Sequence, residues 1–214
     1  MQVNLQWATA GGDEMVAYLA RISNPDNQGN DATAPKLVKY LIDHQHWSPF
    51  EMVNVCLEIV CPRDIARQIL RHRSFTFQEF SQRYADVGVL PQADLRHARM
   101  QDPKNRQKSI HATDADTLNW WDEAQEEVRE FTSDLYTRAL SQGIAKEVAR
   151  AILPEGLTQS RLYMNGTLRS WMHFYQVRSG HGAQKEIQDL AHMVGKIIEP
   201  LFPVSWAALT TKEG

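Results

Sequence analysis

The stretch MVNVCLEIVCPRDIARQIL, residues 52–70, holds the clearest strand of this sequence and the turn that leads into a helix. From 52 to 60 apolar side chains recur at every second position, which is the period of a half-buried strand. Pro62 then begins a helix, because proline is tolerated in a first helical turn. Gln68 and Arg71 are three residues apart and therefore share one face of that helix.

Further elements follow from the same periodicities on both sides of this stretch. We expect strands at 3–7 and 160–164, and the helices at 13–22, 34–44, 114–141, 144–152, 168–177 and 183–198. Thr33 is expected to cap the helix that follows it. Residues 86–112 are mostly polar, which predicts one long loop of the kind that often acts as a lid. Few strands combined with several helices indicate an α+β fold.

The composition is typical of one globular domain. Apolar residues make up 43% and charged residues 23% of the 214 residues, and the formal net charge is −3. A protein that binds nucleic acid through its overall field is usually basic, so any anion binding here must be local. Residues 1–7 lack the pattern of a signal peptide, and no apolar stretch approaches the length of a membrane span. We therefore expect a soluble, cytoplasmic protein with one domain over residues 1–214.

The cysteines and histidines argue against two further classes of site. Cys56 and Cys61 do not form a CxxC pair, which argues against a disulfide scaffold and for a reducing compartment. Cys56 alternates within the predicted strand, which favours a structural role. The eight histidines form neither an HExxH nor a Cys-His pattern, so we expect no metal site.

The stretch RHRSFTFQEFSQRY, residues 71–84, places three arginines, a histidine and a glutamate within fourteen residues. Arginine gives planar, bidentate hydrogen bonds to phosphate, which suits nucleotide binding. One alternative is a solvated group of cations that only favours the dipole at a helix C-terminus. A second alternative is a nucleic-acid-binding module, with phosphate contacts and base stacking from Arg63, Arg67, Arg71, Arg73, Arg83, Phe75, Phe77 and Tyr84.

The order of residues 71–84 resembles the signature of flavin-dependent thymidylate synthases, with Thr76 in place of a serine and Gln78 where many members have asparagine. Four other parts of the sequence are similar to the same family: HWSPFE at 46–51, CP at 61–62 with ARQ at 66–68, ARAILP at 149–154, and RSWMHF at 169–174 with Arg178 and AQKEI at 183–187 after it. Many members have asparagine and histidine at two positions that here hold Thr167 and Gly182, with His181 just before the latter.

The resemblance implies a central, mostly antiparallel sheet flanked by helices, one of them long. It also implies the methylation of dUMP to dTMP, with methylenetetrahydrofolate as the carbon donor and NADPH-reduced FAD as the hydride donor. This route needs no cysteine thiolate, and the protein supplies binding and electrostatics around the cofactor. An inactive flavoprotein of the same fold is the alternative that the departures at Thr167 and Gly182 leave open.

The resemblance also implies the site residues. It assigns dUMP contacts to Gln68, Arg71, Glu79, Ser81, Gln82, Arg83, Arg150 and Arg178. It assigns FAD contacts to His46, Ser48, Arg71, His72, Arg73, Glu79, Arg169 and His173. Arg178 is the expected catalytic residue, since a fixed cation near the uracil edge stabilises negative charge that develops at N3 and the adjoining carbonyl. A solvated arginine at a helix end is the alternative for this position.

The expected assembly is a homotetramer with shared active sites and with no nucleic-acid or membrane partner. FAD, dUMP and folate together present a large surface, and such ligands are usually buried between domains or subunits. Trp120 and Trp121 are adjacent on the predicted long helix and so point in different directions. One of them can face the chain's own core while the other meets a partner, and the resemblance implies tetramers whose neighbouring chains share flavin sites.

Overall fold

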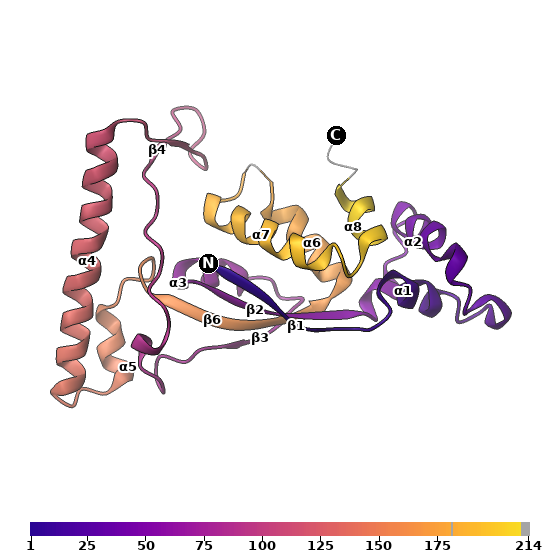
Figure 1. The fold of residues 1–214 in the computed structure, drawn as a ribbon, viewed down its shortest axis with the longest axis horizontal. Helices are drawn as coiled ribbons and strands as arrows, with labels where there is room; N and C mark the ends of the chain where they lie inside the picture. Colours follow the sequence, from indigo (N-terminus) through magenta and orange to yellow (C-terminus); the bar gives the residue numbers. More distant parts are fainter. Residues whose placement is uncertain (181, 211–214) are drawn as a thin grey trace.

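A four-stranded antiparallel sheet lies at the centre of the molecule, in the strand order β1-β2-β6-β3 (Figure 1). The computed structural model describes residues 1–180 and 182–210. Its central strands are β2 (Asn54–Pro62) and β6 (Gln159–Thr167), which pair along their whole length. The edge strands are β1 (Gln2–Ala8), beside β2, and β3 (Thr76–Glu79), beside β6.

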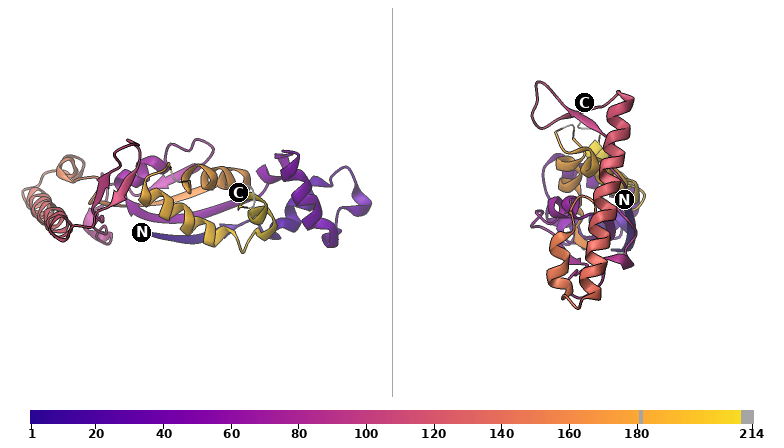
Figure 2. Two further views of the ribbon diagram at one scale, coloured as in Figure 1. Left: turned by 90° about the horizontal axis from the view of Figure 1, so that it is seen from above. Right: turned by 90° about the vertical axis from the view of Figure 1, so that its left-hand side faces the viewer.

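Helices cover one face of this sheet and both of its ends. Figures 1 and 2 show α6 and α7 lying along one face, α1 and α2 at one end, and α4 and α5 at the other. The helices are α1 (Gly12–Ala20), α2 (Ala34–Asp43), α3 (Arg63–Ile69), α4 (Ala115–Ser141), α5 (Lys146–Ala149), α6 (Leu168–Arg178), α7 (Lys185–Ile198) and α8 (Pro203–Thr210). The expected α+β class, with an antiparallel sheet flanked by helices of which one is long, is confirmed. Within the described residues no helix is both long and apolar enough to span a membrane.

The core lies between the covered face of the sheet and α6 and α7. Leu57 of β2 pairs with Met164 of β6, and both side chains are fully buried. Trp171 of α6 is also fully buried, and its Nε1 donates to the carbonyl of Val55 at 3.0 Å. The alternation predicted at residues 52–60 is therefore the pattern that turns one side of β2 into this core.

The signature segment is anchored to the core through Phe75. Its ring centroid lies 4.7 Å from that of Trp171 in an edge-to-face arrangement, and the side chain is 7% exposed. Gly166 of β6 makes room for this ring, because a Cβ atom at that position would lie 2.3 Å from Cδ1 of Phe75. Because β3 begins at Thr76, the packing of Phe75 in the core fixes where this strand starts.

Several sequence-based expectations are wrong. The loop predicted at 86–112 contains a hairpin, β4 (Arg99–Gln101) and β5 (Ser109–His111), and the helix α8 and the strand β3 were not expected at all. Thr33 precedes α2 but makes no capping hydrogen bond, because its Oγ1 instead accepts from Nη2 of Arg21 at 2.8 Å. The strand predicted at 52–60 runs from 54 to 62, since a 3-10 turn, η3 (Ser48–Glu51), precedes it and its pairing with β6 extends to Pro62.

The long helix α4 forms where it is predicted, yet most of its apolar side chains are not buried. Asp114 caps the helix by accepting from the backbone N–H of Thr117 at 2.8 Å. Trp121 is partly buried and donates from Nε1 to the carbonyl of Arg96 at 2.8 Å, whereas Trp120 is 63% exposed. Phe131 is 64% exposed. As Figure 1 shows, α4 stands across one end of the sheet, so this chain alone does not cover its outer side.

Candidate active site

Arg178, at the last turn of α6, meets the residues that follow β2. Its Nε donates to Nε2 of His72 at 2.9 Å, and its Nη2 donates to the carbonyl of Gln68 at 3.2 Å. These partners are 106 and 110 positions away in the chain. The contact exists because α3 and α6 lie on the same side of the sheet, where the ring of Phe174 packs edge-to-face against His72 with centroids 5.0 Å apart.

The electrostatics of this cluster define the state of His72. Burial, and then the nearby Arg178 guanidinium and His173, lower the pKa of His72 to about 4. The imidazole is therefore neutral at neutral pH, and Nε2 is free to accept while Nδ1 carries the hydrogen. As the pH falls through about 4 the ring protonates at Nε2 and the hydrogen bond from Arg178 is lost.

Arg178 itself is a half-buried cation without an ion-pair partner among the described residues. Burial, and secondly the positive charge of Arg71, lower the pKa of its guanidinium. The side chain stays charged at neutral pH, because an arginine pKa lies far above that range. A partly desolvated and unpaired cation favours negative charge on whatever group binds beside it.

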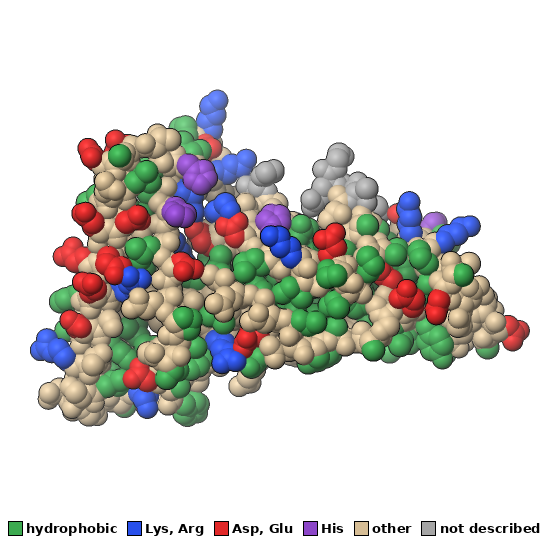
Figure 3. Space-filling view, in the orientation of Figure 1, with side chains coloured by type: hydrophobic (Ala, Val, Ile, Leu, Met, Phe, Trp, Pro, Cys, Tyr) green, Lys and Arg blue, Asp and Glu red, His purple; other side chains and the backbone are tan. Residues whose placement is uncertain are grey.

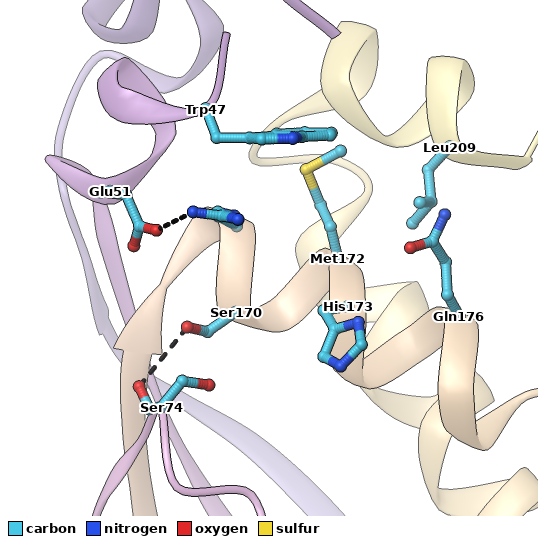
Figure 4. Close-up of a pocket in the computed structure, with 9 residues that line it drawn as sticks. Trp47, Glu51, Ser74, Ser170, Met172, His173, Gln176 and Leu209 are labelled. Atoms are coloured by element: carbon cyan, nitrogen blue, oxygen red, sulfur yellow. Dashed lines mark hydrogen bonds and ion pairs between the residues drawn. The ribbon is translucent and has the colours of Figure 1, made fainter. Parts of the chain in front are cut away.

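A cavity of about 470 Å³ lies between η3 and α6. Figure 4 shows Trp47 and Glu51 projecting from the η3 region toward α6, which carries Ser170, Met172 and His173. The remaining lining residues are Ser74, Arg169, Gln176 and Leu209. Two of the residues predicted to bind FAD, Arg169 and His173, thus line one cavity.

Arg169 is oriented within this cavity by two contacts. Its Nη1 lies 2.7 Å from Oε1 of Glu51, and its Cζ lies 5.7 Å from the ring centroid of Trp47. Thr167 caps α6, because its Oγ1 accepts from the backbone N–H of Ser170 at 3.2 Å, and the same hydroxyl lies 2.9 Å from Oε2 of Glu51. Thr167, which departs from the family pattern, therefore contacts the same Glu51 that orients Arg169.

A second group of signature residues lies beside α5. Nε of Arg83 lies 3.3 Å from Oε2 of Glu147, and Arg150 follows Glu147 by three positions, or about one helical turn. Oγ of Ser81 lies 3.4 Å from the backbone nitrogen of Arg83. Gln82 is 3% exposed, and its Nε2 has no hydrogen-bond partner among the described atoms.

Of the other predicted residues that the structure describes, none lines the 470 Å³ cavity or pairs with Glu147. Glu79 on β3 accepts from Oγ of Ser160 at 2.7 Å and lies 3.6 Å from Nη1 of Arg63. His46 is exposed, with its ring 6.1 Å from those of Tyr40 and His44. Ser48 begins η3. Arg71 and Arg73 are exposed and form no ion pair within the described part of the chain. His181 lies outside the described residues.

Sequence reasoning missed part of the cavity lining. Trp47 and Glu51 belong to the turn motif at 46–51 and Ser74 belongs to the signature, but the resemblance assigns no site role to any of the three. Gln176 and Leu209 come from α6 and α8 and carry no motif signal. An aromatic residue inside a short turn between a helix and a strand was the one available sign that Trp47 faces a site.

The cysteines are both buried and free. Burial, and then the nearby negative charges of Asp64 and Glu79, raise the pKa of the Cys61 thiol to about 12. Burial also raises the pKa of Cys56. Because the thiolate is the reactive form of cysteine, neither residue is poised as a nucleophile at neutral pH.

Comparisons with known proteins agree with the motif resemblance. A family model described as "Thymidylate synthase complementing protein" matches residues 4–204. A probable flavin-dependent thymidylate synthase of Paramecium bursaria Chlorella virus 1 is 48% identical over 191 residues, with 89% of this chain and 87% of the relative covered. The flavin-dependent thymidylate synthase of a Synechocystis species is 47% identical, with 91% and 88% covered.

A solved structure extends the likeness to three dimensions. The UMP/dUMP methylase PolB of Streptomyces cacaoi, bound with 5-Br dUMP, superimposes with a TM-score of 0.85 at 29% identity. The match covers 98% of this chain and 94% of that one. The family model, the curated relatives and this structure point to one group of proteins, and the chain belongs to the flavin-dependent thymidylate synthase family.

Proposed function

We propose that this protein methylates dUMP to dTMP, with methylenetetrahydrofolate as carbon donor and with FAD, reduced by NADPH, as hydride donor. The observation that carries the proposal is the contact of Arg178 with His72 and Gln68, which joins the signature to the C-terminal motif at a half-buried cation. Membership of the family and the dUMP analogue bound to the Streptomyces cacaoi methylase support the substrate.

The residues around the 470 Å³ cavity fit a flavin. Trp47 offers an aromatic face, Arg169 offers donors for ring carbonyls or phosphate, and His173 lies on the same helix one turn further on. Bound FAD supplies the redox chemistry of the reaction. We propose that Arg169 and His173 hold it together with the predicted residues His46, Ser48, Arg71, His72, Arg73 and Glu79.

For dUMP, we propose two separate roles within the chain. Arg83 and Arg150, beside α5, hold the phosphate with Ser81 and Gln82, because two guanidinium groups give directional hydrogen bonds to one dianion. Arg178 contacts the uracil edge near Gln68 and Arg71, where its charge stabilises the electron density that develops on the ring. Neutral His72 keeps the guanidinium in one orientation by accepting from Nε.

The burial of an aromatic residue and the ion pairs of the arginines argue against a nucleic-acid-binding module. Phe75 is 7% exposed and packs on Trp171, so it is not available to stack on a base. Arg67 faces Glu155, and Arg63 lies 3.6 Å from Glu79, which reduces the positive charge available to a phosphate backbone. A gel shift that weakens with salt, from a protein without flavin absorbance, is the result that would favour this alternative.

The purified protein is expected to be yellow, with a flavin absorbance band that shifts when dUMP is added. In a coupled assay it should form dTMP only when dUMP, NADPH and methylenetetrahydrofolate are all present. A visible spectrum and a product assay check both statements. NADPH oxidation without dTMP formation would identify the inactive flavoprotein of the same fold, and a colourless protein that fails to take up added FAD would overturn the proposal.

We also propose that the active unit is a homotetramer with sites shared between chains. The large exposed side chains Trp120, Val128 and Phe131 of α4 support this, because a subunit contact would remove their apolar surface from water. Within one chain, Arg83 contacts Glu147 whereas Arg178 contacts His72, so these two dUMP-binding residues belong to different groups of side chains.

Mixed tetramers of Arg83→Ala and Arg178→Ala chains test this assembly, because these two residues lie in different groups within one chain. If the two residues serve one site from different chains, the mixture should regain activity that neither parent has. Light scattering should give the mass of four chains. A fully active monomer would contradict the proposal, whereas intact tetramers without complementation would show that both residues come from the same chain.

A further inference from the structure

A second cavity, of about 440 Å³, lies between the β4–β5 hairpin and the start of α7. The hairpin contributes Arg99, Arg106 and Lys108, and the start of α7 contributes Gln184 and Lys185. Its volume falls within the range of roughly 300–1,000 Å³ that small-molecule sites occupy. None of the residues assigned above to FAD or dUMP lines it.

The lining of this cavity is cationic. No aspartate or glutamate belongs to it, although the whole chain has a net charge of −3. Arg99 is paired with Glu186 at 2.7 Å, and Lys185 is paired with Asp189. Arg106 and Lys108 are exposed and form no ion pair within the described part of the chain. Figure 3 shows Lys, Arg and His side chains gathered on this side of the molecule, near β4 and α7.

The turn that carries the two unpaired cations is held in shape by its own hydrogen bonds. Nε2 of Gln101 donates to the carbonyls of Asn105 and Lys108, at 3.1 and 3.0 Å. Oδ1 of Asp102 accepts from the backbone N–H groups of Lys104 and Asn105, at 2.8 and 2.9 Å. A turn ordered in this way presents Arg106 and Lys108 with a smaller entropic cost of binding than a loose loop would.

The cavity is joined to the Arg178 cluster through one hydrogen bond. Oε1 of Gln184, which lines the cavity, accepts from Nε2 of Gln68 at 2.8 Å. The carbonyl of the same Gln68 accepts from Arg178. The cavity therefore adjoins the Arg178 cluster through the contact between Gln184 and Gln68.

We propose that this cavity binds the anionic end of a co-substrate, at a distance from the atoms that react. The inference rests on the proposed function, which requires two co-substrates with such ends. NADPH carries a 2′-phosphate, and folates carry one or more γ-linked glutamate carboxylates. Phosphate and carboxylate are both groups that arginine and lysine bind by charge-assisted hydrogen bonds, so the two sources are separated by experiment.

The test uses the full-length double variant Arg106→Ala/Lys108→Ala. Both side chains are exposed and unpaired, so their removal should leave the fold intact. The matched control is Lys36→Ala/Lys39→Ala, which removes the same charge from exposed positions on α2 at the other end of the sheet. Flavin content and the KM for dUMP should be unchanged in both variants.

Two sets of steady-state measurements distinguish the sources. If the 2′-phosphate is bound, the double variant should raise the KM for NADPH on the order of tenfold and leave that for NADH unchanged, since two partly exposed charge contacts are lost. If the glutamate tail is bound, the KM for pentaglutamyl methylenetetrahydrofolate should rise to the value for the monoglutamyl form. The control variant should show neither change.

Calorimetry gives a readout that does not depend on turnover. Adenosine 2′,5′-bisphosphate and penta-γ-glutamate serve as probes for the two anionic ends. One of them should bind the wild-type protein and the control, and should bind the double variant on the order of tenfold more weakly. Equal binding to all three proteins, or none to any, overturns the inference. A wild-type protein that binds a probe but makes no dTMP would instead count against the proposed function.

Discussion

Arg178→Ala is expected to lower the turnover of dUMP by roughly a hundredfold or more while FAD stays bound, because loss of one preorganised electrostatic donor typically costs that much. The residue is a half-buried cation held by His72 and by the carbonyl of Gln68, and it lies outside the lining of the cavity that fits the flavin. The measurement is kcat with saturating co-substrates, together with the flavin spectrum of the purified variant.

Arg178→Lys is the informative companion to this variant. Lysine keeps the charge but lacks the Nε group that donates to His72, so the cation is no longer held in one orientation. We expect its kcat to lie between those of the wild type and Arg178→Ala. If Arg178→Ala turns over at nearly the wild-type rate, Arg178 is a solvated helix-end residue. A colourless variant would indicate a role in holding FAD instead.

Trp171→Ala is expected to destabilise the protein by about 3–5 kcal/mol, the usual cost of removing a buried tryptophan from a core. The side chain is fully buried, and its Nε1 donates to the carbonyl of Val55 at 3.0 Å. Its ring packs edge-to-face on Phe75 at 4.7 Å and on Phe174 at 5.8 Å. Since Phe75 belongs to the signature and Phe174 supports His72, the loss of packing should also reduce turnover.

Urea denaturation at one fixed protein concentration measures this effect, because association would otherwise shift the midpoint. Trp171→Phe serves as the control, since it keeps most of the ring packing but leaves the Val55 carbonyl without its donor. We expect this variant to lose about 1–3 kcal/mol, the cost of an unsatisfied buried acceptor plus a small cavity. A loss below about 1 kcal/mol for Trp171→Ala would show that α6 is not anchored to the sheet by this ring.

Elements with a clear local period were predictable from the sequence. The alternation at 52–60 specifies β2, and the three-to-four spacing at 114–141 specifies α4, whose bounds agree within one residue. The motif at 71–84 predicted the family before any geometry was known, because a long pattern of fixed residues is far more specific than a periodicity. The two periodicities and the motif are each formed by residues that are close together in the sequence.

Short strands with distant partners were not predictable in the same way. β3 has four residues, and β4 and β5 have three each, which is too short for a period to show. Each forms only because a partner strand supplies its backbone hydrogen bonds. For β3 that partner is β6, which lies more than eighty positions later in the chain. The prediction of one long loop at 86–112 failed for this reason.

The amino-acid sequence by itself determined the elements of the sheet's centre, the long helix and the family, since each of these is written in local spacing or residue order. Only the tertiary structure decided that Arg178 reaches His72, that Arg169 and Trp47 share a cavity, and that the outer side of α4 stays exposed in one chain. Periodicity indicates that a face is apolar, but what covers it depends on packing between segments that are far apart in the chain.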